Sequence, residues 1–198
     1  MTDSPRRRGR RPGAPDTRDA ILAAARESFA RDGFDKTSVR AIAEAAGVDA
    51  ALVHHYFGTK RKLFIAAVEI PVDPEQVLSG LMAVEVEDLG RQLILTIVGL
   101  WDGDAGPAAV ALVKANLSAP DPAMLRSFLT EIVLAAIGER LTSGDHVALR
   151  TSLTASQLLG VLVSRHILKL DPIATMPLAD LADMVGPTLQ RYLTGQLS

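Results

Sequence analysis

The sequence predicts an all-α protein, and three observations support this fold class. Apolar residues recur at helical spacing along most of the chain. No segment shows the strict alternation of apolar and polar residues that a half-buried strand would need. Residues that start or stop helices divide the chain at regular intervals: Asp73-Pro74 and Asp121-Pro122 each place a capping carboxylate before a proline suited to a first helical turn.

Start and stop residues also set the expected helix bounds. Gly33, Gly47 and Gly58 are placed to end helices, and Pro71 cannot continue one. The head is expected to contain helices at 17–32, from 37 or 38 to 47 and at 49–57, and a fourth helix from 59 to 70 is expected to connect it to the body. The body is expected to contain helices at 74–83, 85–102, 106–118, 121–142, 145–170 and 178–194. Gly186-Pro187 is expected to kink or interrupt the last helix.

Charge and composition divide the chain into three parts. Residues 1–15 are rich in Pro, Gly and Arg and predict a disordered basic arm. Residues 16–60 form the expected head and 61–198 the body. Through Lys62 the chain has 13 basic against 8 acidic residues, whereas from Leu63 onward it has 8 against 15. The basic head is therefore expected to meet a polyanion, unless its arginines are only a chance cluster in a solubilising tail.

Several classes of protein are excluded or disfavoured. The chain has no cysteine, which excludes disulfides, thiol catalysis and cysteine-ligated zinc. No run approaches the ~18 apolar residues of a membrane span, and the basic N-terminus lacks the apolar stretch of a signal peptide. A cytoplasmic protein is expected. There is no nucleophile–base–carboxylate set, no Gly-rich phosphate loop and no cofactor motif, so neither catalysis nor a cofactor is expected.

Residues 37–60 have the pattern of two short helices joined by a tight turn. Ala43 is small where two helices must approach, and Gly47 suits the turn. Val53 and Phe57 are spaced to pack back on the first helix. This is the pattern of a helix-turn-helix, whose second helix enters the DNA major groove, although similar patterns occur in proteins that never touch DNA.

The same region resembles the TetR family of bacterial repressors over about residues 17–65. The resemblance rests on Thr37-Ser38-Val39-Arg40-Ala41-Ile42-Ala43, on Gly47-Val48, and on Val53-His54-His55-Tyr56-Phe57-Gly58-Thr59-Lys60. Family members usually end the recognition helix with two tyrosines, a histidine and a phenylalanine, and this chain has a permutation of those rings. Fainter similarity to actinobacterial members extends over 89–101 and 186–193. The resemblance implies a homodimeric repressor that a small molecule releases from its operator.

Position and chemistry then assign expected DNA contacts. Thr37 and Ser38, at a helix N-terminus, suit a phosphate. Arg40 matches the family position that reaches guanine in the major groove. Thymine methyls are assigned to Ala50 and Leu52, a base or base methyl to His55, phosphates to His54, Tyr56, Thr59 and Lys60, and an adjacent minor groove to the arm residues Arg8, Arg10 and Arg11. No metal site is expected at His54-His55, because adjacent helical side chains point about 100° apart.

The resemblance implies a dimer formed through the last two long helices. Helix 145–170 is apolar over two neighbouring faces, as a helix covered by both its own core and a partner should be. The predicted dimer contacts are Ala155, Leu159, Leu162 and His166, with Leu181, Val185 and Leu189 from the last helix. The neighbouring face comprises Leu149, Leu153, Ser156, Gly160, Val163 and Ile167. A monomeric helical bundle is the alternative.

The resemblance also implies a ligand pocket among the middle helices. The candidate lining residues are Trp101, Asn116, Met124, Phe128, His146 and Gln157. Ordinary core packing of the large residues and solvation of the polar ones is the alternative. The composition favours an apolar or amphipathic ligand, which would shift the dimer to a state that no longer fits DNA. A dimer without an inducer, a non-specific DNA-coating protein and a small-molecule enzyme are the other functions considered.

Overall fold

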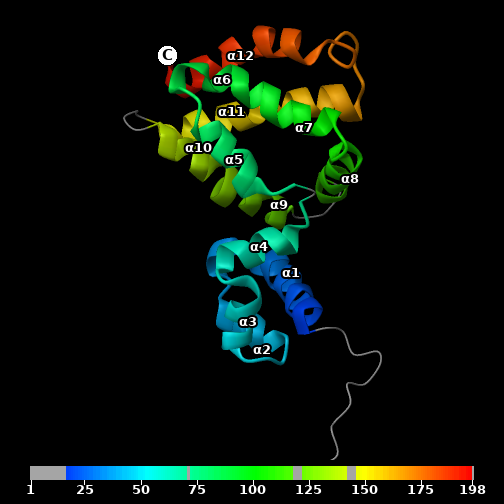
Figure 1. Cartoon of the computed structure of the whole chain (residues 1–198), viewed down its shortest axis with the longest axis vertical. Helices are drawn as coiled ribbons and strands as arrows, with labels where there is room; N and C mark the ends of the chain where they lie inside the picture. The colour runs from blue at the N-terminus through cyan, green and yellow to red at the C-terminus, as the bar shows by residue number, and fades with distance from the viewer. Residues whose placement is uncertain (1–16, 71, 118–121, 142–145, 198) are drawn as a thin grey trace, which may run out of the picture.

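The computed structural model describes residues 17–70, 72–117, 122–141 and 146–197, and every regular element within these ranges is a helix. The predicted all-α class is therefore confirmed. Figure 1 shows a small head at one end of an elongated molecule and a larger helical body at the other. The predicted basic arm, residues 1–15, lies outside the described residues.

The head consists of α1 (Thr17–Lys36), α2 (Val39–Ala45), α3 (Ala50–Phe57) and α4 (Lys60–Val68). Its core forms because apolar side chains at helical spacing face a common centre. The ring of Phe29 on α1 meets the ring of Phe64 on α4 edge to face, with centroids 4.8 Å apart. The fully buried members of this core are Ile21, Ala25, Phe29, Ile42, Leu63 and Phe64.

Three glycines shape the turns of the head. Gly33 (φ 76°) introduces a kink near the end of α1, so the helix bends there and continues to Lys36 instead of ending as predicted. Gly47 (φ 67°) makes the turn between α2 and α3, and Gly58 (φ 72°) makes the turn between α3 and α4. These left-handed conformations suit glycine because it has no Cβ.

Side-chain caps fix the start of four helices. Each cap accepts a hydrogen bond from a backbone amide two or three residues further on, at 2.7 to 3.1 Å. The amides at the first turn of a helix have no partner within it, so these caps determine where each helix begins. The capping residues are Ser38, Asp49, Thr59 and Asp73.

The body contains α5 (Pro74–Met82), α8 (Gly106–Leu117), α12 (Leu178–Thr194) and three longer composite helices. Each composite helix contains a short π-helical segment, in which one turn is wider than an α-helical turn. The first composite helix comprises η1 (Val86–Asp88), α6 (Leu89–Leu93), η2 (Ile94–Val98) and α7 (Gly99–Asp102). The second comprises α9 (Ala123–Phe128), η3 (Leu129–Leu134) and α10 (Ala135–Arg140). The third comprises α11 (Val147–Leu162) and η4 (Val163–Ile167). The π-helical segments are η2, η3 and η4.

Helices α6 and α12 cross in close contact because glycines lie at the crossing. A Cβ on Gly90 would stand 2.5 Å from the carbonyl oxygen of Gly186 and 2.6 Å from the backbone nitrogen of Gln190. The amide side chain of Gln190 holds the crossing together: its Oε1 accepts from the Gly90 amide at 2.8 Å, and its Nε2 donates to the Val86 carbonyl at 2.9 Å.

Helix α12 runs unbroken through Pro187, so the predicted interruption there is wrong. Pro187 cannot donate a hydrogen bond to the carbonyl of Asp183 one turn earlier. Both residues are exposed, and a carbonyl on the solvent side of a helix can be satisfied by water.

One described helix, Val147–Ile167, is long and apolar enough to cross a membrane by length and composition. The pair Val86–Asp102 and Gly106–Asn116, bent by 96°, also passes this test when counted as one span. The core helix of a helical domain passes the same test, and only 28% of the apolar window of Val147–Ile167 is buried within the chain. The rest of the helix is half-buried or exposed.

Candidate DNA-binding head and ligand cavity

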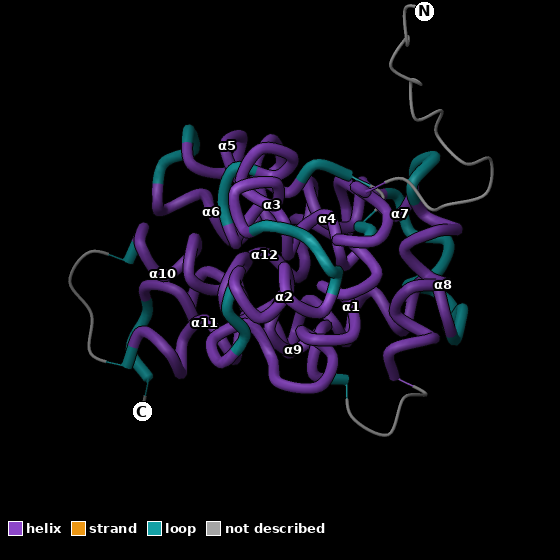
Figure 2. Tube along the Cα trace, turned by 90° about the horizontal axis from the view of Figure 1, so that it is seen from below, coloured by secondary structure: helices purple, strands orange, loops and turns teal. Residues whose placement is uncertain are grey.

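Helices α2 and α3 form the tip of the head, at the far end of the molecule from α12 (Figure 1). Figure 2 looks onto this tip and shows α2 and α3 in front of the body. Val53 and Phe57 bury one side of α3 against the head, and Ile42 does the same for α2. The opposite face of α3 is therefore held rigidly outward, as a helix that enters a DNA groove must be.

Most of the predicted DNA-contacting residues are exposed on this tip. They supply a guanidinium, two imidazoles, a phenol, hydroxyls and an apolar side chain, the groups that meet phosphates, base edges and thymine methyls. Ala50 is half-buried against the core of the head. The exposed residues are Ser38, Arg40, Leu52, His54, His55, Tyr56 and Thr59.

Hydrogen bonding and ring contacts order the end of α3. The Nδ1 of His54 lies 2.9 Å from the carbonyl oxygen of Gly58. A carbonyl only accepts, so Nδ1 must carry the proton and Nε2 is left to face outward. The ring of His55 packs against that of Tyr56, edge to face, at 5.5 Å. The two exposed rings thus restrict each other's orientation.

Thr37 is buried, which corrects the prediction that its side chain contacts a phosphate. It is 3% exposed. Its hydroxyl donates to the carbonyl of Gly33 at 2.7 Å and lies 3.2 Å from that of Ser28. Thr37 therefore fixes the connection between α1 and α2. The neighbouring Ser38 is exposed and caps α2.

Lys60 is half-buried and braces α4 against the end of α1. Its Nζ lies 4.3 Å from the ring centre of Phe34 and donates to the carbonyl of Asp35 at 3.3 Å. An ammonium has three donors, so these contacts hold the side chain and leave donors for a phosphate.

The structure also reveals a cation that the sequence did not single out. The guanidinium of Arg18 lies 5.4 Å from the ring centre of Phe57, beside the end of α3, and its side chain is exposed. Its charge in the first turn of a helix was visible in the sequence, but its proximity to α3 was not. The arm residues Arg8, Arg10 and Arg11 lie outside the described residues.

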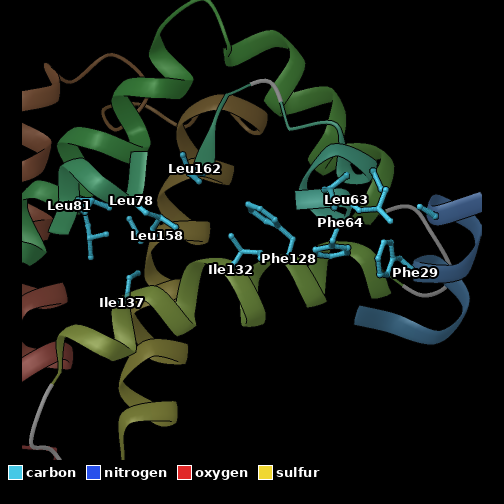
Figure 3. Packing of buried hydrophobic residues seen from close by; sticks show 14 of the residues in the cluster. Phe29, Leu63, Phe64, Leu78, Leu81, Phe128, Ile132, Ile137, Leu158 and Leu162 are labelled. Atoms are coloured by element: carbon cyan, nitrogen blue, oxygen red, sulfur yellow. The ribbon is translucent and has the colours of Figure 1, made fainter. Parts of the chain in front are cut away.

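The body contains a partly open cavity of about 300 Å³. Figure 3 shows part of the surrounding packing, with side chains from α5, α9 and α11. Among the lining residues, Ser156 is the one with a polar aliphatic side chain, and none carries a charge. The composite helices supply most of the wall, including Ile97, Trp101, Phe128, Val133 and Leu162, and α5 supplies Leu81.

Two of the six predicted ligand residues, Trp101 and Phe128, line this cavity. Asn116 and Met124 instead border a separate, shallower hollow between α1, α4, α8 and α9, and the Asn116 amide donates to the Leu112 carbonyl of its own helix at 2.9 Å. His146 is exposed at the start of α11, and Gln157 is half-buried without lining the cavity. The prediction that these four residues line the cavity is therefore wrong.

The predicted dimer contacts mostly face inward, and this corrects the predicted surface. Ala155, Leu159 and Leu162 line the cavity, while Leu181 and Leu189 are buried in the protomer's own core. Val185 is half-buried and packs on that core. His166 lies beneath the surface beside Trp101 and Asp102. The two helices predicted to form the dimer interface do reach the surface, but through other residues.

The outward surface of α11 and η4 is the neighbouring face of the predicted helix. Leu149 and Gly160 are exposed there, and Ser156 is exposed while also bordering the cavity. Met184 of α12 is another apolar side chain on the surface, at 67% exposure. The other members of the α11 and η4 face are half-buried: Leu153, Val163 and Ile167.

Two hydrogen bonds join the head to the helix that walls the cavity. The backbone amide of Phe34 donates to the hydroxyl of Ser127 at 3.3 Å, and the Nη1 of Arg61 donates to the carbonyl of Glu131 at 3.0 Å. Ser127 directly precedes Phe128, which contributes to the cavity. The sequence did not indicate these contacts, because they join residues 70 to 93 positions apart.

Within the described part of the chain, no three His, Asp or Glu side chains come together as a metal site would require. The pKa of His166, beside the cavity, departs from its ordinary value. Burial lowers the pKa of this imidazole, Arg165 lowers it further, and Asp102 opposes both effects.

Comparison with known proteins gives consistent matches. Residues 87–193 match the family model described as "Tetracyclin repressor-like, C-terminal domain", and residues 21–67 match "Bacterial regulatory proteins, tetR family". The HTH-type transcriptional repressor AcnR of Corynebacterium efficiens is 42% identical over 50 residues, which are 25% of this chain and 27% of AcnR. The HTH-type transcriptional repressor NicS of Pseudomonas putida is 30% identical over 86 residues, which are 43% of this chain and 41% of NicS.

A solved structure aligns along nearly the whole chain. The crystal structure of a TetR-family regulator from Streptomyces coelicolor A3 is 36% identical, covers 93% of this chain and 98% of that chain, and has a TM-score of 0.47. The alignments with the two curated repressors, by contrast, span less than half of those proteins' lengths.

Proposed function

Since the chain belongs to the TetR family of bacterial regulatory proteins, we propose that it is a sequence-specific transcriptional regulator, a homodimeric repressor released from its operator by a small apolar ligand. The observation that carries DNA binding is the tip of the head, where a rigidly seated α3 presents exposed imidazoles, a phenol and Leu52 beside the exposed Arg40 of α2. This role belongs to the compartment that holds the chromosome, the cytoplasm.

In the proposed complex, α3 enters the major groove. Arg40 takes a guanine, and Leu52 and Ala50 meet thymine methyls, while His55 reaches a base edge. The arm residues Arg8, Arg10 and Arg11 lie in an adjacent minor groove. The phosphate contacts come from Ser38, His54, Tyr56, Thr59 and Lys60.

A second copy of the chain covers the outward face of α11 and η4 in this proposal. The support is the low burial of an apolar helix: 28% of its most apolar window is buried within one protomer, although apolar surface gains free energy by leaving water. A C2 dimer places two heads on one DNA face, where they match the half-sites of a palindrome.

The proposed signal runs from the cavity to the head through α9 and η3. Phe128 and Leu129 line the cavity. Next to them, the Ser127 hydroxyl accepts a hydrogen bond from the Phe34 amide, and the Glu131 carbonyl accepts one from Arg61 of α4. A ligand that pushes this wall outward changes the position of both anchors. The ligand shifts the equilibrium only by the difference between its affinities for the two states.

The test is a gel-shift titration with DNA from upstream of this protein's own gene and its divergent neighbour, with random DNA as competitor. The proposal expects a retarded band that survives an excess of competitor. If neither this region nor an operator selected from randomised oligonucleotides binds better than random DNA, the regulator function is wrong. Release of the band by an apolar compound tests the ligand response separately.

A further inference from the structure

Trp101 forms part of the cavity wall, and the ring of a histidine packs against its indole. Trp101 lines the cavity at the end of α7. Its ring centre is 5.5 Å from that of His166 in η4, with the planes tilted by 44°. His166 does not line the cavity itself. The indole is thus a part of the cavity wall that His166 contacts.

The Nε2 of His166 lacks a hydrogen-bond partner. Among the described residues it is the buried side-chain nitrogen that remains unsatisfied, and the side chain is 13% exposed. The nearest acceptor, Oδ1 of Asp102, is 3.6 Å away, too far for a hydrogen bond. A buried polar atom without a partner is unfavourable, and native structures rarely retain one without a function.

Asp102 is already occupied by another group. Its two carboxylate oxygens accept from Nε and Nη2 of Arg165, each at 2.9 Å. The remaining Nη1 of Arg165 donates to the backbone carbonyls of Ile173 and Met176. This network neutralises the local charge and fixes the backbone around His166, while leaving the imidazole free to bond to something else.

The rest of the cavity offers almost nothing polar. The hydroxyl of Ser156 donates to the Leu153 carbonyl of its own helix at 2.8 Å. The other lining side chains are hydrocarbon, apart from the indole nitrogen of Trp101. A polar group on a bound molecule can thus reach the indole nitrogen or the buried, unsatisfied imidazole of His166. His166 lies one helical turn beyond Leu162, on the same side of the helix.

We propose that His166 is the polar anchor of the cavity, and that the ligand is an uncharged, largely hydrocarbon molecule with a hydroxyl at one end, admitted to the imidazole when Trp101 turns aside. The inference rests on the proposed ligand response. Burial lowers the pKa of His166, so the imidazole is neutral near pH 7. A hydroxyl both donates and accepts and therefore fits either neutral tautomer, whereas an ionised group would find no opposite charge on the wall.

The test compares 1-heptanol with 1-chloroheptane, which share a heptyl chain and the number of heavy atoms but differ in the hydroxyl. Trp101 is the chain's only tryptophan, so its fluorescence reports on this end of the cavity during titration with either probe. The measured quantity is the ratio of the two dissociation constants. It is compared between the wild type, His166→Phe and the matched control His146→Phe, whose side chain is exposed outside the cavity.

The preference for heptanol relative to chloroheptane is expected to fall about fivefold in His166→Phe, the effect of losing one hydrogen bond, and to stay unchanged in His146→Phe. An unchanged ratio in His166→Phe overturns the inference and leaves the ligand cavity standing. If neither probe binds the wild type, the inference and the proposed ligand response both fail.

A measurement on the wild type covers the case in which His166→Phe does not fold. The imidazole ¹⁵N shifts of the four histidines are recorded with and without saturating 1-heptanol. A change at Nε2 of His166 that 1-chloroheptane does not reproduce supports the hydrogen bond. No change at this nitrogen contradicts it.

Discussion

The backbone amide of Phe34, at the end of the head's first helix, donates a hydrogen bond to the hydroxyl of Ser127, the residue before the cavity-lining Phe128. Ser127→Ala leaves this amide without its partner. The free energy of unfolding is expected to fall by about 1 kcal/mol in urea denaturation. Thr130→Ala is the control, because the Thr130 hydroxyl is exposed and bonds within its own helix; an equal loss there would show that the link between head and body is not the cause.

Arg40→Ala is expected to weaken operator binding about tenfold to hundredfold, because a bidentate contact with guanine is lost. Fluorescence anisotropy with a labelled operator measures this change, and the loss should be smaller on random DNA. Arg31→Ala serves as the control, since Arg31 is exposed on α1 and paired with Asp32 at 2.8 Å. Equal losses on operator and random DNA would place Arg40 on a phosphate instead.

Gly90→Ala is expected to destabilise the body by about 3 kcal/mol, because both clashing groups belong to the backbone of α12 and cannot move aside locally. Gly80→Ala, in α5, meets nothing within 4 Å and is expected to raise the free energy of unfolding by about 0.5 kcal/mol. Both are measured by urea denaturation. Full stability of Gly90→Ala would mean that the helices can separate without cost.

The protein is expected to lose stability as the pH falls below the ordinary histidine pKa of 6.5, in part through His166. Its pKa is lowered in the fold, so the unfolded chain binds more protons in this range. This contribution is complete above pH 6.5 and is lost as the pH falls toward the lowered pKa. Urea denaturation between pH 5 and 7.5 should show a flatter profile for His166→Phe than for the wild type; identical profiles for the two proteins would contradict the assignment.

Gly160→Arg is expected to convert the proposed dimer into a monomer of 21.1 kDa. Gly160 lies on the outward face of α11, and a Cβ there meets nothing within 4 Å, so one protomer can accommodate the change. Light scattering after gel filtration gives the mass, and circular dichroism confirms the fold. Gly80→Arg is the exposed control. If the wild-type protein already has the mass of a monomer, the proposed dimer interface is wrong.

Local chemistry explains what the sequence could predict. The bounds of most helices follow from caps such as Ser38 and Asp49 and from glycines such as Gly47, whose effects extend over only a few residues. The helix-turn-helix and its exposed residues could be predicted from the sequence for the same reason. Thr37 and Ser38 were indistinguishable in sequence, because the burial of Thr37 depends on carbonyls brought near by the bend at Gly33.

Distant packing explains what the sequence could not predict. The two apolar faces of α11 are adjacent and similar in composition, and the positions of η2, η3, α10 and α12 decide which one is buried. Leu162 of α11 is therefore buried, contrary to the prediction, and so is Leu189 of α12. His146, the N-cap residue of α11, and Gln157 do not line the cavity.

The π-helical segments allow the cavity to change when single residues are inserted into or deleted from the chain. η2 contributes Ile97 to the wall, η3 contributes Leu129 and Val133, and η4 carries His166. Each segment holds one residue more than an α-helix would use over the same rise. Deleting that residue would restore the α-helical pitch while the helix beyond the segment keeps its orientation, so the change is confined to the wall residues of the π-helical turn. Single-residue insertions and deletions at these points can thus alter ligand preference while the head remains untouched.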